Sequence, residues 1–221
     1  MDMNQSRDIL RVHATKNRTK VLGPGERFAL WLQGCEKNCA GCMSLSSRNP
    51  NDGKLIPVDS LANKILAEKN IEGVTVSGGE PFLQFKALCN LLQQLREKSS
   101  LGVIIYTGYY LTELREMNIP KIEEIITKYA DIIIDGPYID ELNDGKSLRG
   151  SSNQTVHFLS PRYKENASSI YDQNDRKWEI VYDSEEEFLC GIPDKTGYQI
   201  WRGISMPKQT GNEKGNGDLI V

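Results

Sequence analysis

Three cysteines, Cys35, Cys39 and Cys42, lie within eight residues of one another. They follow directly after an apolar run at residues 28–32, which is typical of a buried strand. Thiolates this close in sequence can reach one metal centre without bringing distant segments together. Soft thiolate ligands select zinc, copper(I) or iron–sulfur clusters. The spacing C-x3-C-x2-C therefore predicts a metal-binding loop at the end of a strand.

The predicted metal centre has no fourth ligand nearby in the sequence. The remaining cysteines are Cys89 and Cys190, and the only histidines are His13 and His157. A structural zinc or an electron-transfer cluster normally has four protein ligands. Three thiolates alone favour a four-iron cluster with one iron left open for another ligand. A zinc loop that borrows Cys89 or Cys190 is the alternative, although Cys89 lies on the apolar side of a predicted helix and is interpreted as core packing.

The composition excludes several classes of protein. The 221 residues are enough for one domain with a sizeable core and an appendage. The 27 basic and 30 acidic residues nearly balance, which argues against a general nucleic-acid-binding protein. No apolar stretch has the length of a membrane span, and residues 1–8 contain no hydrophobic signal region. Clustered cysteines indicate a reducing compartment, so we expect a soluble cytoplasmic protein.

Apolar runs and turn signals predict strands that alternate with helices up to residue 160. We expect strands at residues 27–32, 71–77, 101–107, 131–135 and 155–159, and helices at residues 59–69, 84–98, 111–117 and 121–129. Such alternation predicts a parallel sheet with right-handed crossovers. Five strands are too few for a barrel of eight. The expected fold class is therefore α/β, with a partial, open (β/α) barrel.

The character of the sequence changes after residue 160. Residues 1–160 form the predicted core domain, with residues 1–20 as an N-terminal edge segment that contains a short strand at residues 8–13. Residues 161–221 are interpreted as a C-terminal extension of open function. We expect in it, in order, a polar loop at residues 161–176, a β-hairpin at residues 178–192 with an acidic turn, and a disordered tail at residues 208–217.

Further motifs accompany the cysteine loop in a fixed order. They are Gly-Pro-Gly at residues 23–25, Ser-Gly-Gly-Glu-Pro at residues 77–81, Asp-Gly-Pro at residues 135–137 and RGSSNQ at residues 149–154. Over roughly residues 20–160, the series resembles the radical S-adenosylmethionine (SAM) superfamily. Within that superfamily it is most similar to the activating enzymes of glycyl-radical enzymes, in particular that of anaerobic ribonucleotide reductase.

This resemblance implies cofactors and partners. Cys35, Cys39 and Cys42 would hold a 4Fe-4S cluster and SAM would bind its open iron. In the superfamily, an electron from the cluster splits SAM into methionine and a 5′-deoxyadenosyl radical, which here would take a hydrogen from a glycine Cα of a partner. The implied partners are a glycyl-radical enzyme, above all anaerobic ribonucleotide reductase, and a low-potential donor such as flavodoxin or ferredoxin. No nucleic acid or membrane is implied.

The resemblance assigns the amino group of SAM to Gly78, Gly79 and Glu80. Two glycines let the backbone approach a ligand closely, and a carboxylate accepts hydrogen bonds from an ammonium group. A plain strand-to-helix turn is the alternative. Asp135 is a further SAM-contacting candidate, with a simple cap of its strand end as the alternative. Many related activating enzymes have a lysine where this chain has Pro137.

The adenine of SAM is assigned to Gly41, Cys42 and Met43, through backbone contacts. Met43 stands where activating enzymes of the reductase often have an aromatic residue. Asn153, within RGSSNQ, would border SAM or a docked loop of the partner. A polar loop that satisfies its own backbone is the alternative.

Two other functions stay open. The first is a radical SAM enzyme that modifies a peptide or a small molecule, which the extension keeps possible. The second is a non-catalytic iron–sulfur or zinc binding module. Thr107 and Tyr109 are site candidates by position alone, since both follow the third predicted strand.

Overall fold

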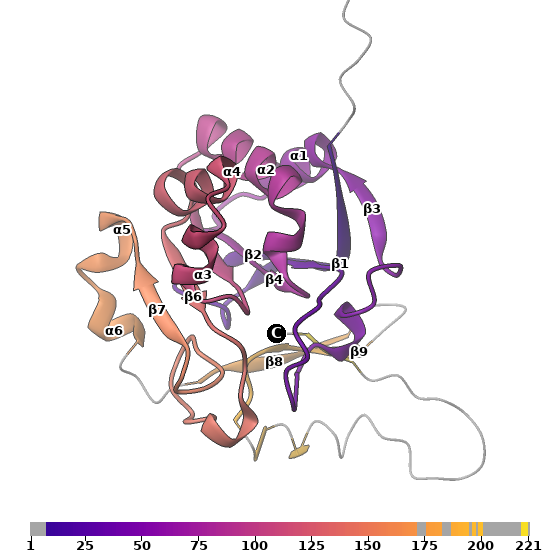
Figure 1. Cartoon of the computed structure of the whole chain (residues 1–221), viewed down its shortest axis with the longest axis vertical. Coiled ribbons are helices and arrows are strands. Elements are labelled where there is room, and N and C mark those ends of the chain that lie inside the picture. Colours follow the sequence, from indigo (N-terminus) through magenta and orange to yellow (C-terminus); the bar gives the residue numbers. More distant parts are fainter. Residues whose placement is uncertain are drawn as a thin grey trace, which may run out of the picture.

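A seven-stranded sheet organises the chain, in the order β3-β1-β2-β4-β5-β6-β7 (Figure 1). The computed structural model describes residues 8–171, 176–182, 187–194, 196–197, 199–200 and 218–220. The strands of the sheet are β1 (Ile9–Thr19), β2 (Arg27–Leu32), β3 (Lys54–Pro57), β4 (Gly73–Gly78), β5 (Gly102–Tyr106), β6 (Ile132–Asp135) and β7 (Thr155–Phe158). Strands β2, β4, β5 and β6 pair in parallel. Within the described residues β3 and β7 form open edges, so the fold is mixed α/β with no closed barrel.

Two expectations about the sheet are wrong. β7 pairs antiparallel with β6 instead of adding a fifth parallel strand. The connection between them contains only the short 3-10 helix η4 (Asp140–Leu142), whereas a parallel crossover normally carries a helix back across the sheet. β1 is not an edge strand, because β3 pairs with its outer side. It also continues to Thr19, beyond the short strand expected at residues 8–13.

The predicted helices are present within a few residues and lie together on one face of the sheet (Figure 1). They are α1 (Val58–Ala67), α2 (Phe85–Lys98), α3 (Leu111–Glu116) and α4 (Pro120–Glu124), which continues as a π-helix, η3 (Ile125–Tyr129). Alternate residues of the strands, such as Leu30, Val76 and Ile105, pack against these helices in one apolar cluster. No helix within the described ranges has the length and apolarity to cross a membrane.

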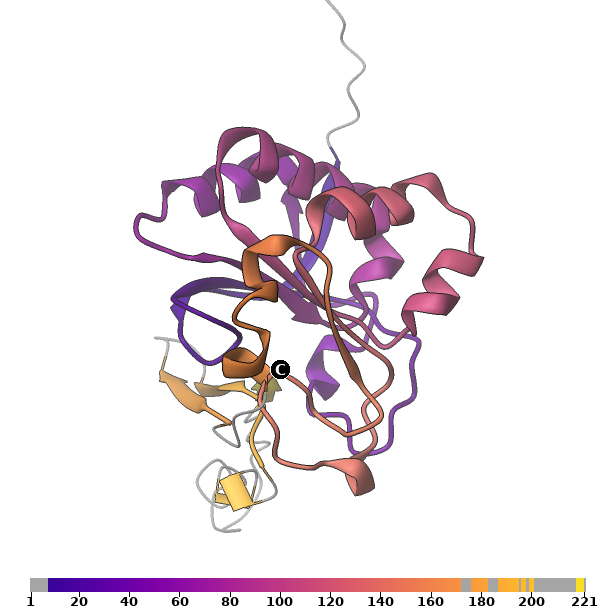
Figure 2. The same ribbon diagram turned by 90° about the vertical axis from the view of Figure 1, so that its left-hand side faces the viewer.

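The other face of the sheet is covered by the C-terminal part of the chain (Figure 2). Its elements are α5 (Pro161–Lys164), α6 (Ala167–Tyr171), β8 (Trp178–Tyr182), β9 (Glu187–Gly191) and β10 (Asp218–Ile220), and β8 and β9 form the predicted antiparallel hairpin. Leu189 and Ile192 pack on Ile104 and Ile134 of the sheet. The extension therefore completes the core on this face.

The expected loop at residues 161–176 is wrong for its first part, which forms α5 and α6. Pro161 at the first helical position favours the first turn, and Tyr163 anchors α5 with 4% of its surface exposed. The acidic turn was expected at residues 183–187. Its first four residues lie outside the described residues, as does the expected tail at residues 208–217, and Glu187 begins β9.

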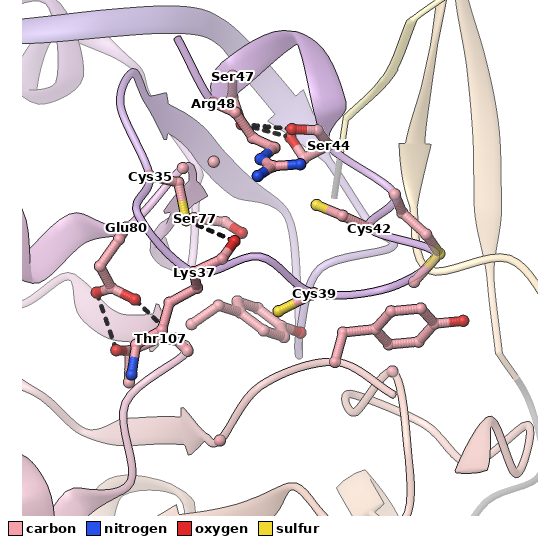
Figure 3. A pocket seen from close by; sticks show the side chains of 18 of the residues that line it. Cys35, Lys37, Cys39, Cys42, Ser44, Ser47, Arg48, Ser77, Glu80 and Thr107 are labelled. Atoms are coloured by element: carbon pink, nitrogen blue, oxygen red, sulfur yellow. Dashed lines mark hydrogen bonds between the residues drawn. The ribbon is translucent and has the colours of Figure 1, made fainter. Parts of the chain in front are cut away.

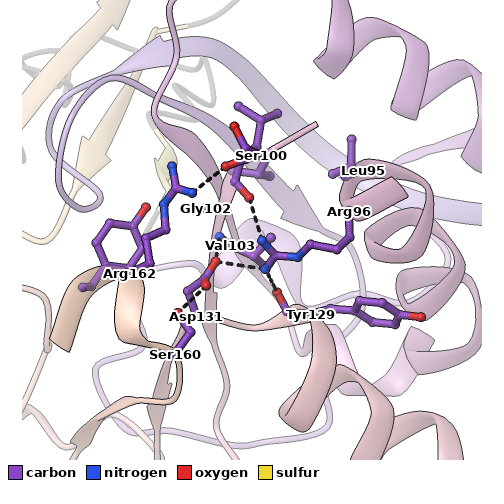
Figure 4. Close-up of polar contacts among 12 residues, drawn as sticks. Leu95, Arg96, Ser100, Gly102, Val103, Tyr129, Asp131, Ser160 and Arg162 are labelled. Carbon is purple, nitrogen blue, oxygen red and sulfur yellow. Dashed lines mark hydrogen bonds and ion pairs between the residues drawn. The ribbon is translucent and has the colours of Figure 1, made fainter. Parts of the chain in front are cut away.

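Buried ion pairs and hydrogen bonds close the end of the sheet where the parallel strands begin. Asp131, just before β6, accepts hydrogen bonds from Arg96 (3.0 Å) and from the backbone N–H of Val103 (2.8 Å), as Figure 4 shows. Arg27, fully buried at the start of β2, donates to Thr75 (2.7 Å) and to Tyr163 (3.1 Å). These contacts hold together the starts of neighbouring strands.

Candidate metal and cofactor site

A pocket opens at the opposite end, where the parallel strands finish (Figure 3). Active sites of parallel βα folds lie at this carboxyl end. The pocket encloses about 730 Å³ of empty space, its open mouth included. The loop after β2, the ends of β4 and β5, the loop after β6 and one residue of the extension contribute to its lining.

All three predicted ligand cysteines line this pocket, and none is in a disulfide. Burial raises the pKa of Cys35 to about 11 and also raises the pKa of Cys42. Without a bound metal centre, these two side chains are neutral thiols at pH 7. A bound metal centre would deprotonate them, since thiolates are the metal-ligating form.

The cysteine loop is folded back on the segment that follows it. Gly34 leaves β2 with φ +99°, a conformation that favours glycine. Its backbone N–H donates to the Ser47 carbonyl (2.7 Å), and the N–H of Cys35 donates to the Arg48 carbonyl (3.0 Å). These bonds turn the loop across the end of the sheet, which brings the cysteines to the pocket.

The three sulfur atoms surround the pocket rather than converge on one point (Figure 3). Within the described ranges, no three His, Cys, Asp or Glu side chains are arranged to hold a single metal ion. Zinc ligands converge on one ion at about 2.3 Å, whereas in a 4Fe-4S cluster each thiolate binds a different iron. The arrangement therefore fits a cluster better than a zinc site.

The two other cysteines lie elsewhere. Cys89 is fully buried in the core on α2, as predicted, with its thiol 3.6 Å from Glu124. Cys190 is buried on β9 beside Thr19, at 3.5 Å. Neither lines the pocket, so neither is placed as a fourth thiolate.

Gly78 and Gly79 line the pocket and join the end of β4 to the cysteine loop. A Cβ at Gly78 would lie 2.4 Å from the backbone of Leu32, and one at Gly79 would lie 2.2 Å from the Gly34 carbonyl oxygen. Close backbone approach is therefore needed here, but the neighbours that require it are the end of β2 and the start of the cysteine loop. The N–H of Gly79 donates to the Leu32 carbonyl at 2.8 Å.

Glu80 places a buried carboxylate on the lining, with 1% of its surface exposed. It accepts hydrogen bonds from the backbone N–H groups of Phe82 (2.9 Å) and Gly108 (2.7 Å) and from the Thr107 hydroxyl (2.9 Å). Burial raises its pKa to about 7, although these bonds act in the opposite direction. A carboxylate has about four acceptor positions, so one is left for a ligand.

Residues 21–157 match the family described as "4Fe-4S single cluster domain", which is more than half of the chain. The chain belongs to this family. The resemblance seen in the motifs and the expected iron–sulfur cofactor are thereby confirmed. The match ends at residue 157, before the C-terminal extension.

Several similar proteins are activating proteins. The anaerobic ribonucleoside-triphosphate reductase-activating protein of Enterobacteria phage T4 is 30% identical over 141 residues, 62% of this chain and 86% of the relative. The protein of that name from Vibrio cholerae is 31% identical over 146 residues, which cover 62% of this chain and 90% of the relative. The pyruvate formate-lyase-activating enzyme of Clostridium pasteurianum is 29% identical over 150 residues, which cover 63% of this chain and 59% of the relative.

In this family member, Asp135 and Asn153 lie beside the pocket but not on its lining. Asp135 accepts from the backbone N–H of Leu111 (2.8 Å), and His157 lies 2.9 Å away. Asn153 donates to the Pro137 carbonyl at 2.7 Å. These contacts favour the structural alternatives for both residues, and their assignment to SAM stays a prediction.

The neighbours of those two residues reach the lining instead. Gly136 follows Asp135, and Gln154 follows Asn153. Gln154 donates from its side-chain amide to the Gly136 carbonyl at 2.8 Å and accepts from the backbone N–H of Gly150 at 2.7 Å. The RGSSNQ segment thus holds its own backbone in shape and presents one side of the pocket.

Cys42 and Met43 line both this pocket and a second one beside it, and Gly41 lines the second alone. Met43 is buried, with 8% of its surface exposed. Gly41 has φ +73°, and a Cβ there would lie 2.9 Å from Asp140. The structure therefore brings the three predicted adenine-binding residues together at one corner.

Several lining residues were not expected from the sequence, among them Lys37, Tyr106, Tyr138 and Ile192. Lys37 lies inside the cysteine loop, with Nζ 3.7 Å from the ring centroid of Tyr109 and 3.8 Å from Glu113. Its place between two ligand cysteines was a usable signal. Ile192 gave none, since only the packing of the extension brings it to the pocket.

Proposed function

We propose that this chain is a radical SAM activating enzyme that generates a glycyl radical on a partner, above all on anaerobic ribonucleotide reductase. One observation carries the proposal. Three free thiols on the loop after β2 share one pocket with the GGEP segment, in a chain whose relatives are reductase-activating proteins. That combination supports a cluster with an open iron next to a binding site for SAM.

The cofactors would be held by this chain's own side chains. Cys35, Cys39 and Cys42 would bind three irons of a 4Fe-4S cluster and leave the fourth for SAM. When bound, the cluster and SAM supply an electron and a 5′-deoxyadenosyl radical, which takes a hydrogen atom from a glycine Cα. A low-potential donor such as flavodoxin or ferredoxin would replenish the electron.

The other residues would position SAM. The remaining acceptor position of Glu80 and the turn at Gly78 and Gly79 suit its ammonium group. Gly41, Cys42 and Met43 suit its adenine.

Asp135 and Asn153 would act on SAM through their neighbours on the lining. Asp135 holds the end of β6, where Gly136 begins the next turn, and Asn153 holds the Pro137 carbonyl. Both contacts keep the wall of the pocket in place.

The fold agrees with this function. Parallel strands β2, β4, β5 and β6 with helices on one face resemble a partial (β/α) barrel of the radical SAM type. We assign residues 1–160 to that core and residues 161–221 to the extension. Because Ile192 of the extension lines the pocket, the extension would also shape access to SAM.

The test is anaerobic reconstitution with iron and sulfide, followed by SAM and dithionite, with and without the reductase. We expect 5′-deoxyadenosine, and a glycyl doublet on the reductase by electron paramagnetic resonance. Fully loaded protein that forms no 5′-deoxyadenosine would leave only a binding module. 5′-Deoxyadenosine without the doublet would point to a peptide or small-molecule substrate instead.

A further inference from the structure

The Tyr106 side chain ends in a polar atom that the described part of the chain does not satisfy. Tyr106 is the last residue of β5, and it is 9% exposed. Its hydroxyl is buried and has no hydrogen-bond partner among the described residues. Tyr106 lines the same pocket as the three ligand cysteines and the GGEP segment. An unpaired donor is thus available at the site of the predicted cofactors.

The surroundings explain why the described part of the chain offers no partner. Tyr106 packs in one cluster with Ile104 and Ile134 of the sheet and with Met43 of the loop after β2, all apolar. The adjacent polar residue, Thr107, uses its hydroxyl to donate to Glu80. A buried hydroxyl without a partner lowers stability, and a phenylalanine would fill this apolar space without that cost. The hydroxyl therefore suits a bound molecule better than it suits the core.

Tyr106 is a neutral donor under all ordinary conditions. Burial raises its pKa, and the positive charges of Arg27 and Arg176 oppose this only in part. A neutral phenol donates to oxygen or nitrogen acceptors. SAM carries such acceptors on its carboxylate, its ribose and its adenine.

We propose that Tyr106 is a ligand-binding residue whose hydroxyl donates a hydrogen bond to bound SAM. The inference rests on the proposed function, because it assumes that SAM enters the pocket beside the cysteines. It adds a contact from β5 to those assigned by motif, none of which includes this tyrosine.

The test compares Tyr106→Phe with the wild-type protein, both with reconstituted clusters. SAM binding is measured by anaerobic equilibrium dialysis without a reductant, so that no turnover occurs. We expect the variant to bind SAM about 5- to 30-fold more weakly, the loss typical of one hydrogen bond to a neutral or charged acceptor. Thermal unfolding without SAM should be unchanged or shifted upward, because no hydrogen bond within the protein is lost.

Tyr163→Phe is the matched control. The Tyr163 hydroxyl bonds to Arg27 (3.1 Å) and to Glu72 (3.0 Å), and Tyr163 does not line the pocket. This variant should unfold at a lower temperature and bind SAM like the wild type. The opposite pattern of the two tyrosines separates ligand binding from a structural role.

Unchanged SAM affinity in Tyr106→Phe would overturn the inference, whether or not its stability changes. The proposed function would be untouched by that result, since the wild type would still bind SAM. Wild-type protein with a full cluster but no affinity for SAM would overturn both.

Discussion

The two ends of the parallel strands both bury polar groups, but they use them differently. Where the strands begin, Arg27 donates to Thr75 and Tyr163 and to the carbonyls of Val74 and Gly102, both at 2.8 Å. Where the strands finish, three thiols are not bonded to one another, and the Tyr106 hydroxyl has no hydrogen-bond partner in the part of the chain that the structure describes. At the starting end the Arg27 donors are bonded within the chain, although Arg96 Nε there has no partner among the described residues. The finishing end leaves ligand-binding capacity at the pocket unused.

The difference teaches how stability and function are separated in this fold. Paired polar groups at the start of the strands hold neighbouring strands together, whereas buried acceptors and donors with spare bonding capacity at the finish cost stability and are useful only to a ligand. Substitutions at the starting end should therefore lower stability without changing ligand affinity. Substitutions at the finishing end should do the reverse.

The largest effect is expected from Cys39→Ser at the finishing end. Loss of one thiolate should reduce the retention of the cluster and the formation of 5′-deoxyadenosine more than about 100-fold, beyond the typical effect of an outer-shell change. Iron and sulfide analysis with a SAM cleavage assay measures this. Cys89→Ser, in the core away from the pocket, should keep its cluster. A cluster that survived Cys39→Ser at full occupancy would contradict the ligand assignment.

At the starting end, Arg27→Met should lower the free energy of unfolding by about 3 kcal/mol or more, because several buried acceptors lose their donor. Urea unfolding of the protein without its cluster measures this. SAM affinity of the folded, reconstituted variant should stay at the wild-type value. A clear loss of affinity would show that the two ends are not independent.

Glu80 should make stability depend on pH. Its pKa is about 7 in the folded protein against an ordinary value of 4.5, so the folded state keeps the proton to higher pH than the unfolded chain. The contribution of protonated Glu80 to stability is fully present below about pH 4.5 and is lost as the pH rises to about 7. The free energy of unfolding should fall by roughly 3 kcal/mol over this range.

Urea unfolding of the cluster-free protein at pH 5 and pH 8 measures this dependence. The glutamine of Glu80→Gln cannot ionise, so the free energy of unfolding of this variant should fall correspondingly less between the two pH values. Equal falls in the variant and the wild type would show that other groups cause the effect.

The smallest effect is expected from Arg176→Lys, which tests how the extension is held to the finishing end. Arg176 donates to Asn143 (2.7 Å) and to the carbonyls of Arg149 (2.6 Å) and Pro193 (3.1 Å). Lysine keeps the charge but cannot span all three, so unfolding should become easier by about 1–2 kcal/mol. SAM affinity should fall less than about 3-fold, because only the wall at Ile192 loosens. Denaturant unfolding and equilibrium dialysis measure the two quantities.

Local patterns predicted the parts of the site that lie close in sequence. The cysteine loop and the GGEP turn both line the pocket, because each comes directly after the end of a buried strand. The four parallel strands were also predicted, since apolar runs such as Ile132–Asp135 are typical of strands covered on both faces. The direction of β7 and the presence of β3 were not predicted, because short half-polar strands are recognised only by the strands with which they pair.

The sequence by itself determined the metal-binding loop, the α/β character and the family. Only the tertiary structure decided which polar groups are left for a ligand. The Asp135 and Asn153 side chains are bonded within the chain, whereas the Tyr106 hydroxyl has no partner among the described residues. No local pattern distinguishes these cases. The reason is physical: a buried polar group is satisfied or left open by neighbours that are distant in sequence, and folding alone brings those neighbours together.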